Sequence, residues 1–395
     1  MSGEVSRRGR NAPGGTGEEK VLGPEHSDTL STVHSLASVL HSQKKYKEAE
    51  MMHRSVLEKL EEKLDPEDPT TLTVVNSIAS AISRQERYEE AEAMYRRVLE
   101  TRERVLGLDH PQTLNAVNNL GLALDNQGKS GEAEAMFRRA VAGSERVLGP
   151  EHPDTLASTC ILAEFLQKQA KLEDAETMCR QALEGQEKVL GPEHPDTLLS
   201  IIKLASILDR QGKHEDAERL HRRALSAREK IRGPEHQDTL TSIGHVASIL
   251  EKQGKHEEAV IMNQRALEGR SKVLGPEHPS ILTSVNNLAT ALFNLGKHDE
   301  AVAMFQRALE GREKALGPDH PETLIVVSNI GFVFLQQGKY EEAETMYRRA
   351  LEEQTKVFGP EHPDTLFSAN KLASALDGQG RKKEAKAIRK SMARN

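Results

Sequence analysis

The amino-acid sequence restarts every 42 residues, nine times in succession, without an insertion or a deletion. The copies open at Gly23, Asp65, Gly107, Gly149, Gly191, Gly233, Gly275, Gly317 and Gly359. A fixed period of this length is typical of repeat arrays, in which each copy packs mainly against its neighbours. The sequence therefore predicts a stack of like units, with function on the surface of the stack.

Each copy contains two segments in which apolar residues recur at helical spacing. In the fourth copy we expect the first helix to begin at Pro153 and to end near Lys168, and the second to run for about 18 residues before Gly-Pro. Six copies place glycine in the turn between these helices, where a left-handed residue is favoured. Lys44, Glu86 and Ala170 occupy that place in the other three. The predicted fold class is all-α, with about 18 antiparallel helices.

Small residues recur at one position in each helix of the copy. The second helix has alanine there in all nine copies, from Ala49 to Ala385, and the first helix has alanine or glycine, as in Ala163 and Gly121. Small side chains let helix backbones approach closely. Only 3% of the residues are aromatic and there is no tryptophan, so the predicted core consists of Leu, Ala, Val, Ile and Met.

The recurring pattern LAxxLxxQGKxxEA, followed by an aromatic residue and then AL, resembles the tetratricopeptide repeat. The period of 42 residues and the string HPDTL resemble its kinesin light chain subclass. Similar long repeats belong to arrays attached to NB-ARC-type signalling ATPases. The resemblance implies a single right-handed superhelical solenoid of nine helix-turn-helix repeats over residues 18–395, with the last copy acting as a C-terminal cap. Residues 1–17, rich in Gly, Arg and Ser, are expected to form a disordered tail.

The resemblance also implies a non-enzymatic scaffold or adaptor that binds extended peptides along its first helices. The residues it places in this groove are Asn76, Asn118, Asn119, Lys203, Arg210, His245, Lys252, Asn286, Asn287, Asn294, Asn329, Asn370 and Lys371. A side-chain amide both donates and accepts, so a row of asparagines can pair with a peptide backbone. The basic members suit an acidic or phosphorylated ligand. The alternative is that the asparagines bond only between neighbouring helices.

More than one biological role stays open. Likeness to kinesin light chains implies cargo adaptation with a kinesin heavy chain. Those proteins carry a heptad segment before the array, whereas this sequence has about 17 residues there. Motor association is therefore left open. Residues 19–22 match residues 187–190 at the end of a second helix, which indicates an array cut from a longer one. The alternative function is therefore ligand sensing, as part of an NB-ARC-type signalling ATPase or as a descendant of one. A passive spacer is a further alternative.

Other site chemistries find no support in the sequence. Eight histidines share one position, but successive copies in a stack lie roughly 10 Å apart, whereas metal ligands converge within about 2 Å of one ion, so we expect a structural role at the helix start. The string Gly128-Lys129-Ser130 lacks the earlier glycine of a phosphate-binding loop, because Ala123 stands there. We therefore expect no enzyme, no cofactor and no metal.

Charge and cysteine usage limit the partners and the location. The 61 acidic and 54 basic residues, with a net charge of -7, are spread through every copy, so a basic face for nucleic acid is not expected. There is no run of 18 apolar residues, which argues against membrane insertion. The two cysteines form no CxxC motif, as expected of a cytoplasmic protein.

Overall fold

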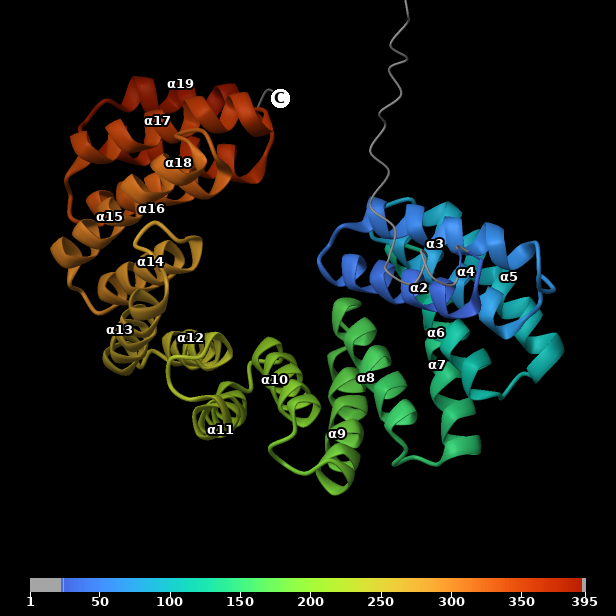
Figure 1. The fold of residues 1–395 in the computed structure, drawn as a ribbon. Helices are drawn as coiled ribbons and strands as arrows, with labels where there is room; N and C mark the ends of the chain where they lie inside the picture. The colour runs from blue at the N-terminus through green and yellow to red at the C-terminus, as the bar shows by residue number, and fades with distance from the viewer. Residues whose placement is uncertain (1–22, 24, 393–395) are drawn as a thin grey trace, which may run out of the picture. The chain divides into compact units, whose positions relative to one another are not determined.

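The computed structural model describes residue 23 and residues 25–392. The expected tail at 1–17 and the segment 18–22 lie outside the described residues. Over the described part of the chain there are eighteen helices and no strand, which confirms the all-α prediction (Figure 1). Two helices belong to each 42-residue copy.

The first helices are α2 (Ser27–Ser42), α4 (Pro69–Ser83), α6 (Pro111–Asn126), α8 (Pro153–Lys168), α10 (Pro195–Arg210), α12 (Gln237–Lys252), α14 (Pro279–Asn294), α16 (Pro321–Gln336) and α18 (Pro363–Gly378). The second helices are α3 (Tyr46–Glu61), α5 (Tyr88–Leu106), α7 (Ser130–Leu148), α9 (Leu172–Val189), α11 (His214–Arg232), α13 (His256–Val273), α15 (His298–Leu316), α17 (Tyr340–Phe358) and α19 (Lys382–Met392). The bounds expected for the fourth copy are confirmed.

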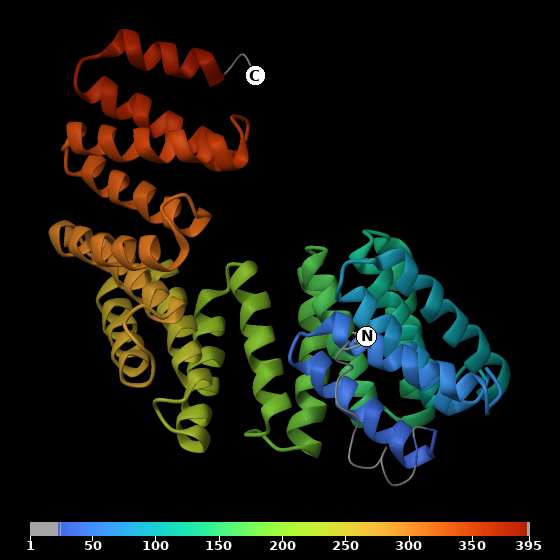
Figure 2. The same ribbon diagram turned by 45° about the horizontal axis from the view of Figure 1, so that its top comes forward.

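The helices form two compact units, one ending at Pro192 with α2–α9 and one beginning at Glu193 with α10–α19. Inside each unit the two helices of a copy pack against each other, and the second helix packs on the first helix of the next copy (Figure 2). First helices of neighbouring copies also touch, as α6 and α8 do. The single uninterrupted solenoid over 18–395, with a cap in its last copy, stays a prediction.

The recurring histidines cap the first helices. Nδ1 of His152 accepts a hydrogen bond from the backbone N–H of Asp154 at 3.2 Å, and seven more histidines do the same in their own copies. In the second copy Asp68 replaces the histidine, and its Oδ1 accepts from the N–H of Thr70 at 2.8 Å. These bonds satisfy a backbone donor that the first turn leaves unpaired. The structural role predicted for the histidines is confirmed.

The turn inside each copy is left-handed, as predicted. Gly128 has a φ of 77° there, and Ala170, Lys44 and Glu86 have φ values of 58°, 63° and 64°. Glycine adopts this conformation without steric cost, whereas a residue with a Cβ atom is strained by it. Three copies therefore retain the turn geometry with an unfavourable residue.

Close helix packing explains the small residues. All nine alanines of the second helix are fully buried, and a Cβ atom on Gly121 would lie 2.7 Å from the ring of Phe137. The sequence did not indicate another close approach near the end of the second helix, where a Cβ atom on Gly143 would lie 2.5 Å from Leu114. Small residues at these positions therefore let the two helices of a copy pack closely.

Candidate functional site

Three of the predicted asparagines meet in the first unit. Nδ2 of Asn119 on α6 donates to Oδ1 of Asn76 on α4 at 2.9 Å, and also to Oδ1 of Asn115 at 3.1 Å. Asn118 is buried, and its Nδ2 donates to Oγ of Ser158 on α8 at 2.8 Å. Each of these asparagines thus bonds to a neighbouring first helix, which is the alternative given above, and their contact with a peptide stays a prediction.

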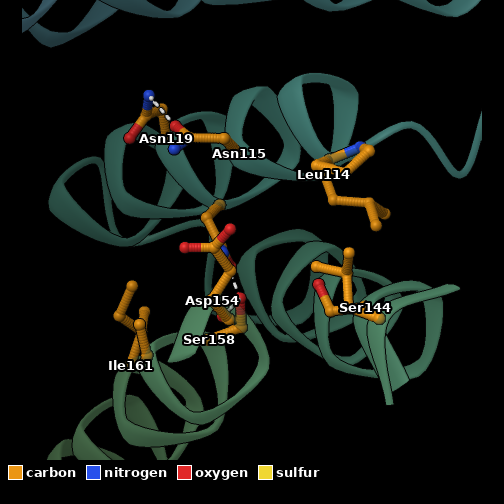
Figure 3. A pocket seen from close by; sticks show the side chains of 11 residues that line it. Leu114, Asn115, Asn119, Ser144, Asp154, Ser158 and Ile161 are labelled. Atoms are coloured by element: carbon orange, nitrogen blue, oxygen red, sulfur yellow. Dashed lines mark hydrogen bonds between the residues drawn. The ribbon is translucent and has the colours of Figure 1, made fainter. Parts of the chain in front are cut away.

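Three hollows follow this row. The histidine hollow, with His41, His53, Asn76 and Ser80 in its lining, has a volume of 320 Å³. The tyrosine hollow, with Tyr46, Ser80, Arg84, Tyr88, Tyr95 and Asn119, has a volume of 440 Å³. The serine hollow, with Asn118, Asn119, Ser144, Asp154 and Ser158, has a volume of 150 Å³ (Figure 3). Ser80 and Asn119 each line two neighbouring hollows, so the three lie next to one another along α2–α8.

The tyrosine hollow combines aromatic walls with a cation. Tyr46 and Tyr88 are half-buried, and Tyr95 is buried at 5% exposure. Burial raises the pKa of Tyr95 to about 12, although a hydrogen bond with Ser80 and the charge of Arg84 oppose the shift. These tyrosines were not among the residues predicted for the groove, although the sequence shows their concentration: three of the five tyrosines of the chain lie between residues 46 and 95.

Two polar residues predicted for the groove of the second unit are engaged by neighbouring carboxylates. Nζ of Lys252 on α12 lies 2.5 Å from Oδ2 of Asp209 on α10. Nδ2 of Asn294 on α14 donates to Oε2 of Glu251 on α12 at 2.6 Å. Each pair joins the ends of successive first helices. These side chains support the stack, whatever else they bind.

The other predicted residues of the second unit vary in exposure. His245 is half-buried, with its ring centroid 5.2 Å from that of His221. Nζ of Lys371 lies 5.1 Å and 5.3 Å from the ring centroids of Phe332 and Phe367. Arg210, Asn287 and Asn370 are exposed, whereas Lys203, Asn286 and Asn329 are half-buried. A hollow of 170 Å³ in this unit, around Arg270, contains none of the predicted residues.

A glutamate near the start of the second helix joins each copy to the next in much of the array. Glu92 is 9% exposed and accepts hydrogen bonds from Arg96 at 2.9 Å and from Gln127 and Lys129 of the following turn, both at 2.7 Å. Burial by itself raises the pKa of this carboxyl, but the three donors outweigh burial and lower the pKa to about 2. We call this arrangement a glutamate cluster.

Glutamate clusters recur in both units. The glutamates that accept from the following turn in the same way are Glu50, Glu134, Glu218 and Glu344. In the sixth and seventh copies the position holds Val260 and Val302, which pack in an apolar core with Ala301 and Phe305. Five junctions thus carry a glutamate cluster, whereas the valines add apolar contact at two others, one of which also has Gln337 donating to Asp299 at 2.9 Å. The residues of the cluster recur at fixed spacing in the sequence, but their contact across the junction is not apparent from it.

Two family models match the sequence. The model of one tetratricopeptide repeat family matches residues 70–146, 155–230, 200–272, 238–313, 280–352 and 324–388, and the model of another matches residues 29–70. The matches together cover well over half of the chain. No relative was found among curated protein sequences.

Solved structures with tetratricopeptide folds resemble this chain. One is a protein from Podosopora anserina that is assigned as a kinesin light chain with nearly identical repeats. It is 28% identical to this chain, and the match covers 52% of this chain and 98% of that protein, with a TM-score of 0.49. The apo form of RapI is 10% identical, with coverages of 90% and 98% and a TM-score of 0.60. A signal transduction ATPase from Pyrococcus horikoshii with a tetratricopeptide repeat sensor is 14% identical, with coverages of 87% and 52% and a TM-score of 0.56. The last two likenesses are of fold.

Across the described residues, no group of three or more His, Cys, Asp or Glu side chains is placed to hold a metal ion. Likewise, none of the helices described is long and apolar enough to cross a membrane.

Proposed function

Because the chain belongs to the tetratricopeptide repeat family, whose repeats serve as interaction scaffolds, we propose that it is a non-enzymatic adaptor that binds an extended peptide of a partner protein. The peptide lies along the three neighbouring hollows of the first unit. The observation that carries this proposal is that the hollows adjoin one another along the first helices, since Ser80 and Asn119 each line two of them. The cysteine usage supports a cytoplasmic location for the adaptor.

The lining supports a peptide ligand in particular. Asn119 keeps an amide oxygen for a peptide N–H, since its Nδ2 is the group used by Asn76 and Asn115. Tyr46 and Tyr88 offer partly exposed rings, which provide large contact area at low entropic cost. Specificity then comes from side chains that enter the hollows, while the amides hold the main chain.

An acidic residue of the peptide fits the tyrosine hollow. Arg84 is exposed there, and no ion pair to it is found among the described residues. A guanidinium binds a carboxylate or phosphate through two parallel hydrogen bonds. The sequence predicts an acidic ligand, and we place its contact at Arg84 of the first unit. Lys252 is less suited to this contact because it is already paired with Asp209.

The test is selection of peptides from a random library displayed on phage, using the whole chain as bait. Peptides resynthesised from the selection are titrated into the wild type and into the variant Tyr88→Ala/Arg84→Ala. We expect the variant to lose at least about tenfold in affinity, about 1.4 kcal/mol, because it removes an aromatic wall and the cation of one hollow. Isothermal titration calorimetry measures the change, after circular dichroism has shown unchanged helicity.

The matched control is Asn287→Ala/Asn370→Ala, which changes exposed first-helix residues of the second unit. It should leave the affinities unchanged. Peptides that bind both variants equally well, or a library that yields no binder, would count against a groove in the first unit.

Ligand sensing for a signalling ATPase is a second candidate function. It is favoured by the likeness of fold to the Pyrococcus horikoshii ATPase, whose sensor is a tetratricopeptide array. Both functions use the same groove, so the partner distinguishes them. An NB-ARC-type ATPase whose hydrolysis rate changes when a selected peptide is added supports sensing. A motor heavy chain among the proteins that co-purify supports the kinesin light chain-like role.

A further inference from the structure

Four copies carry an arginine near the end of the second helix, and each guanidinium makes hydrogen bonds at the junction with the next copy. These are Arg102, Arg228, Arg270 and Arg312. Nη1 of Arg228 donates to the backbone oxygen of Asp238 and to Oγ of Ser242, both at 2.9 Å. The junction between two copies is therefore a guanidinium site, which the chain fills with its own side chain.

The same backbone oxygen accepts a guanidinium in two further junctions. Nη1 of Arg102 donates to the oxygen of Gln112 at 2.9 Å, and Nη1 of Arg312 donates to that of Glu322 at 2.7 Å. Arg102 and Arg312 are buried, at 6% and 7% exposure. A guanidinium has five N–H donors and no acceptor, so its burial requires a pocket of acceptors. The oxygen at the start of the first helix is a recurring part of that pocket.

The junction of the third and fourth copies has a different residue in place of the arginine. Ser144 on α7 stands there and is 2% exposed. The same acceptor groups are present, because Asp154 is equivalent to Asp238 in the repeat and Ser158 is equivalent to Ser242. Here Oγ of Ser158 donates to the backbone oxygen of Asp154 at 3.0 Å and accepts from Nδ2 of Asn118 at 2.8 Å. The serine hollow lies among these residues, with Ser144 contributed by α7 and Asp154 and Ser158 by α8 (Figure 3).

The junction of the sixth and seventh copies provides an internal comparison. The hollow of 170 Å³ at the matching place contains Arg270, whose guanidinium donates to Oγ of Ser284. Ser284 is not part of that hollow's lining, whereas its equivalent Ser158 lines the serine hollow. The part of the junction that the guanidinium of Arg270 fills is thus open space between the third and fourth copies.

Asn118 is a second, independent sign that this space suits a hydrogen-bond donor. Its side chain lines the hollow and is 8% exposed, and its Oδ1 has no hydrogen-bond partner within the described structure. Buried acceptors in folded proteins are nearly always paired. The lining also includes the carboxylate of Asp154, and no lysine or arginine is among its residues. The serine hollow offers acceptors together with negative charge.

We propose that the serine hollow binds the guanidinium of an arginine side chain in the bound peptide, an inference that rests on the peptide-binding function proposed above. The guanidinium donates to Oδ1 of Asn118, and it reaches the backbone oxygen of Asp154, the equivalent of the Arg228 acceptor, when the hydroxyl of Ser158 turns away from that oxygen. The carboxylate of Asp154 balances its charge. A cavity of about 150 Å³ holds benzene in other proteins, and a guanidinium has fewer heavy atoms. Lysine lacks the planar fork of donors that reaches several acceptors at once.

The first test titrates N-acetyl-arginine amide into the full chain and follows the Asn118 side-chain amide by NMR. We expect saturable binding to the wild type, with N-acetyl-lysine amide at least about tenfold weaker. The variant Ser144→Arg should abolish binding, because it supplies the guanidinium found in four other copies. Ser144→Ala, the matched control, should retain binding. Circular dichroism confirms that both variants are folded.

Absence of saturable binding, equal binding of the lysine compound, or unchanged binding to Ser144→Arg overturns the arginine site. The second test uses the peptides selected on the wild-type chain, with each arginine replaced by lysine in turn. The proposal is supported if replacing one peptide arginine lowers the affinity for the wild type about tenfold but leaves the affinity for Ser144→Arg unchanged. If these peptides require Tyr88 but no arginine, the adaptor function stands and the arginine site fails. If no peptide is selected, the adaptor function fails and the arginine site fails with it.

Discussion

Two buried histidines, each with a half-buried histidine beside it, show how single residues respond to pH in this array. His221 is 7% exposed, and burial, followed by repulsion from His245, lowers its pKa to about 4. His53 is 1% exposed, and burial together with His34 and His41 lowers its pKa to about 4 in the same way. The folded chain therefore holds these rings neutral at pH values where the unfolded chain begins to bind protons. Their contribution to stability is complete above about pH 6.5 and is lost as the pH falls toward 4.

We expect His221→Phe to reduce the loss of stability on acidification. Phenylalanine occupies the same position in the third and seventh copies as Phe137 and Phe305, so the ring fits. Urea unfolding at about pH 7.5 and about pH 5 measures the change, and the difference between the two midpoints should shrink. Asn263→Phe is the control at the same position, and its difference should equal that of the wild type. An unchanged difference in His221→Phe would contradict the assignment of a proton-linked penalty to this ring.

Individual side chains mark the limit of what the sequence predicts. The period placed His245 correctly on a first helix but could not show its ring against His221, because that contact depends on the preceding helix. The same holds for Asn118, whose bond to Ser158 joins two copies. The tyrosine hollow went unrecognised because Tyr46 and Tyr88 share a position that most other copies fill with a different residue type, and Tyr95 comes from another position of α5. Such sites depend on the residues that vary between copies, and periodicity reports what stays constant.

At the scale of the helix and its turn, local signals suffice. Pro153 and His152 start α8, and a left-handed turn after Lys168 ends it, as expected from the sequence. Each of these signals acts within a few residues, so long-range packing has little opportunity to override it. The hairpin of each copy was therefore predictable in type and in bounds, including the three turns without glycine.

Ala170→Gly should stabilise the first unit by about 1 kcal/mol, because alanine at a φ of 58° is strained and glycine is not. Thermal or urea unfolding measures the change. Gly128→Ala provides the matched control in a neighbouring turn with a φ of 77°, and should destabilise by a similar amount. A neutral or destabilising result for Ala170→Gly would show that the turn accommodates a Cβ atom without strain.

At the scale of the whole chain, contacts run mainly between neighbouring helices inside each unit. Arrays of this kind have a stability that is approximately the sum of terms within repeats and between adjacent repeats. We therefore expect the pieces 23–192 and 193–395 to fold when made separately. Circular dichroism of each piece tests this, and their summed helical signal should match that of the whole chain. A piece that stays unfolded alone would mean that its stability depends on the other.

The glutamate clusters give the array a direction and a rule for changing its length. Each participating copy presents a carboxylate toward its successor and a set of donors toward its predecessor, as Glu92 and Lys129 do at one boundary. Duplicating such a copy as a whole creates a new boundary that is already neutralised, and removing one leaves no orphaned charge. Val260 and Val302 depart from this rule, because behind Val302 the donors Gln337 and Lys339 lie against Asp299, and behind Val260 Lys297 pairs with Glu300 of its own copy. Gene duplication or deletion should therefore be tolerated among the copies that carry the glutamate.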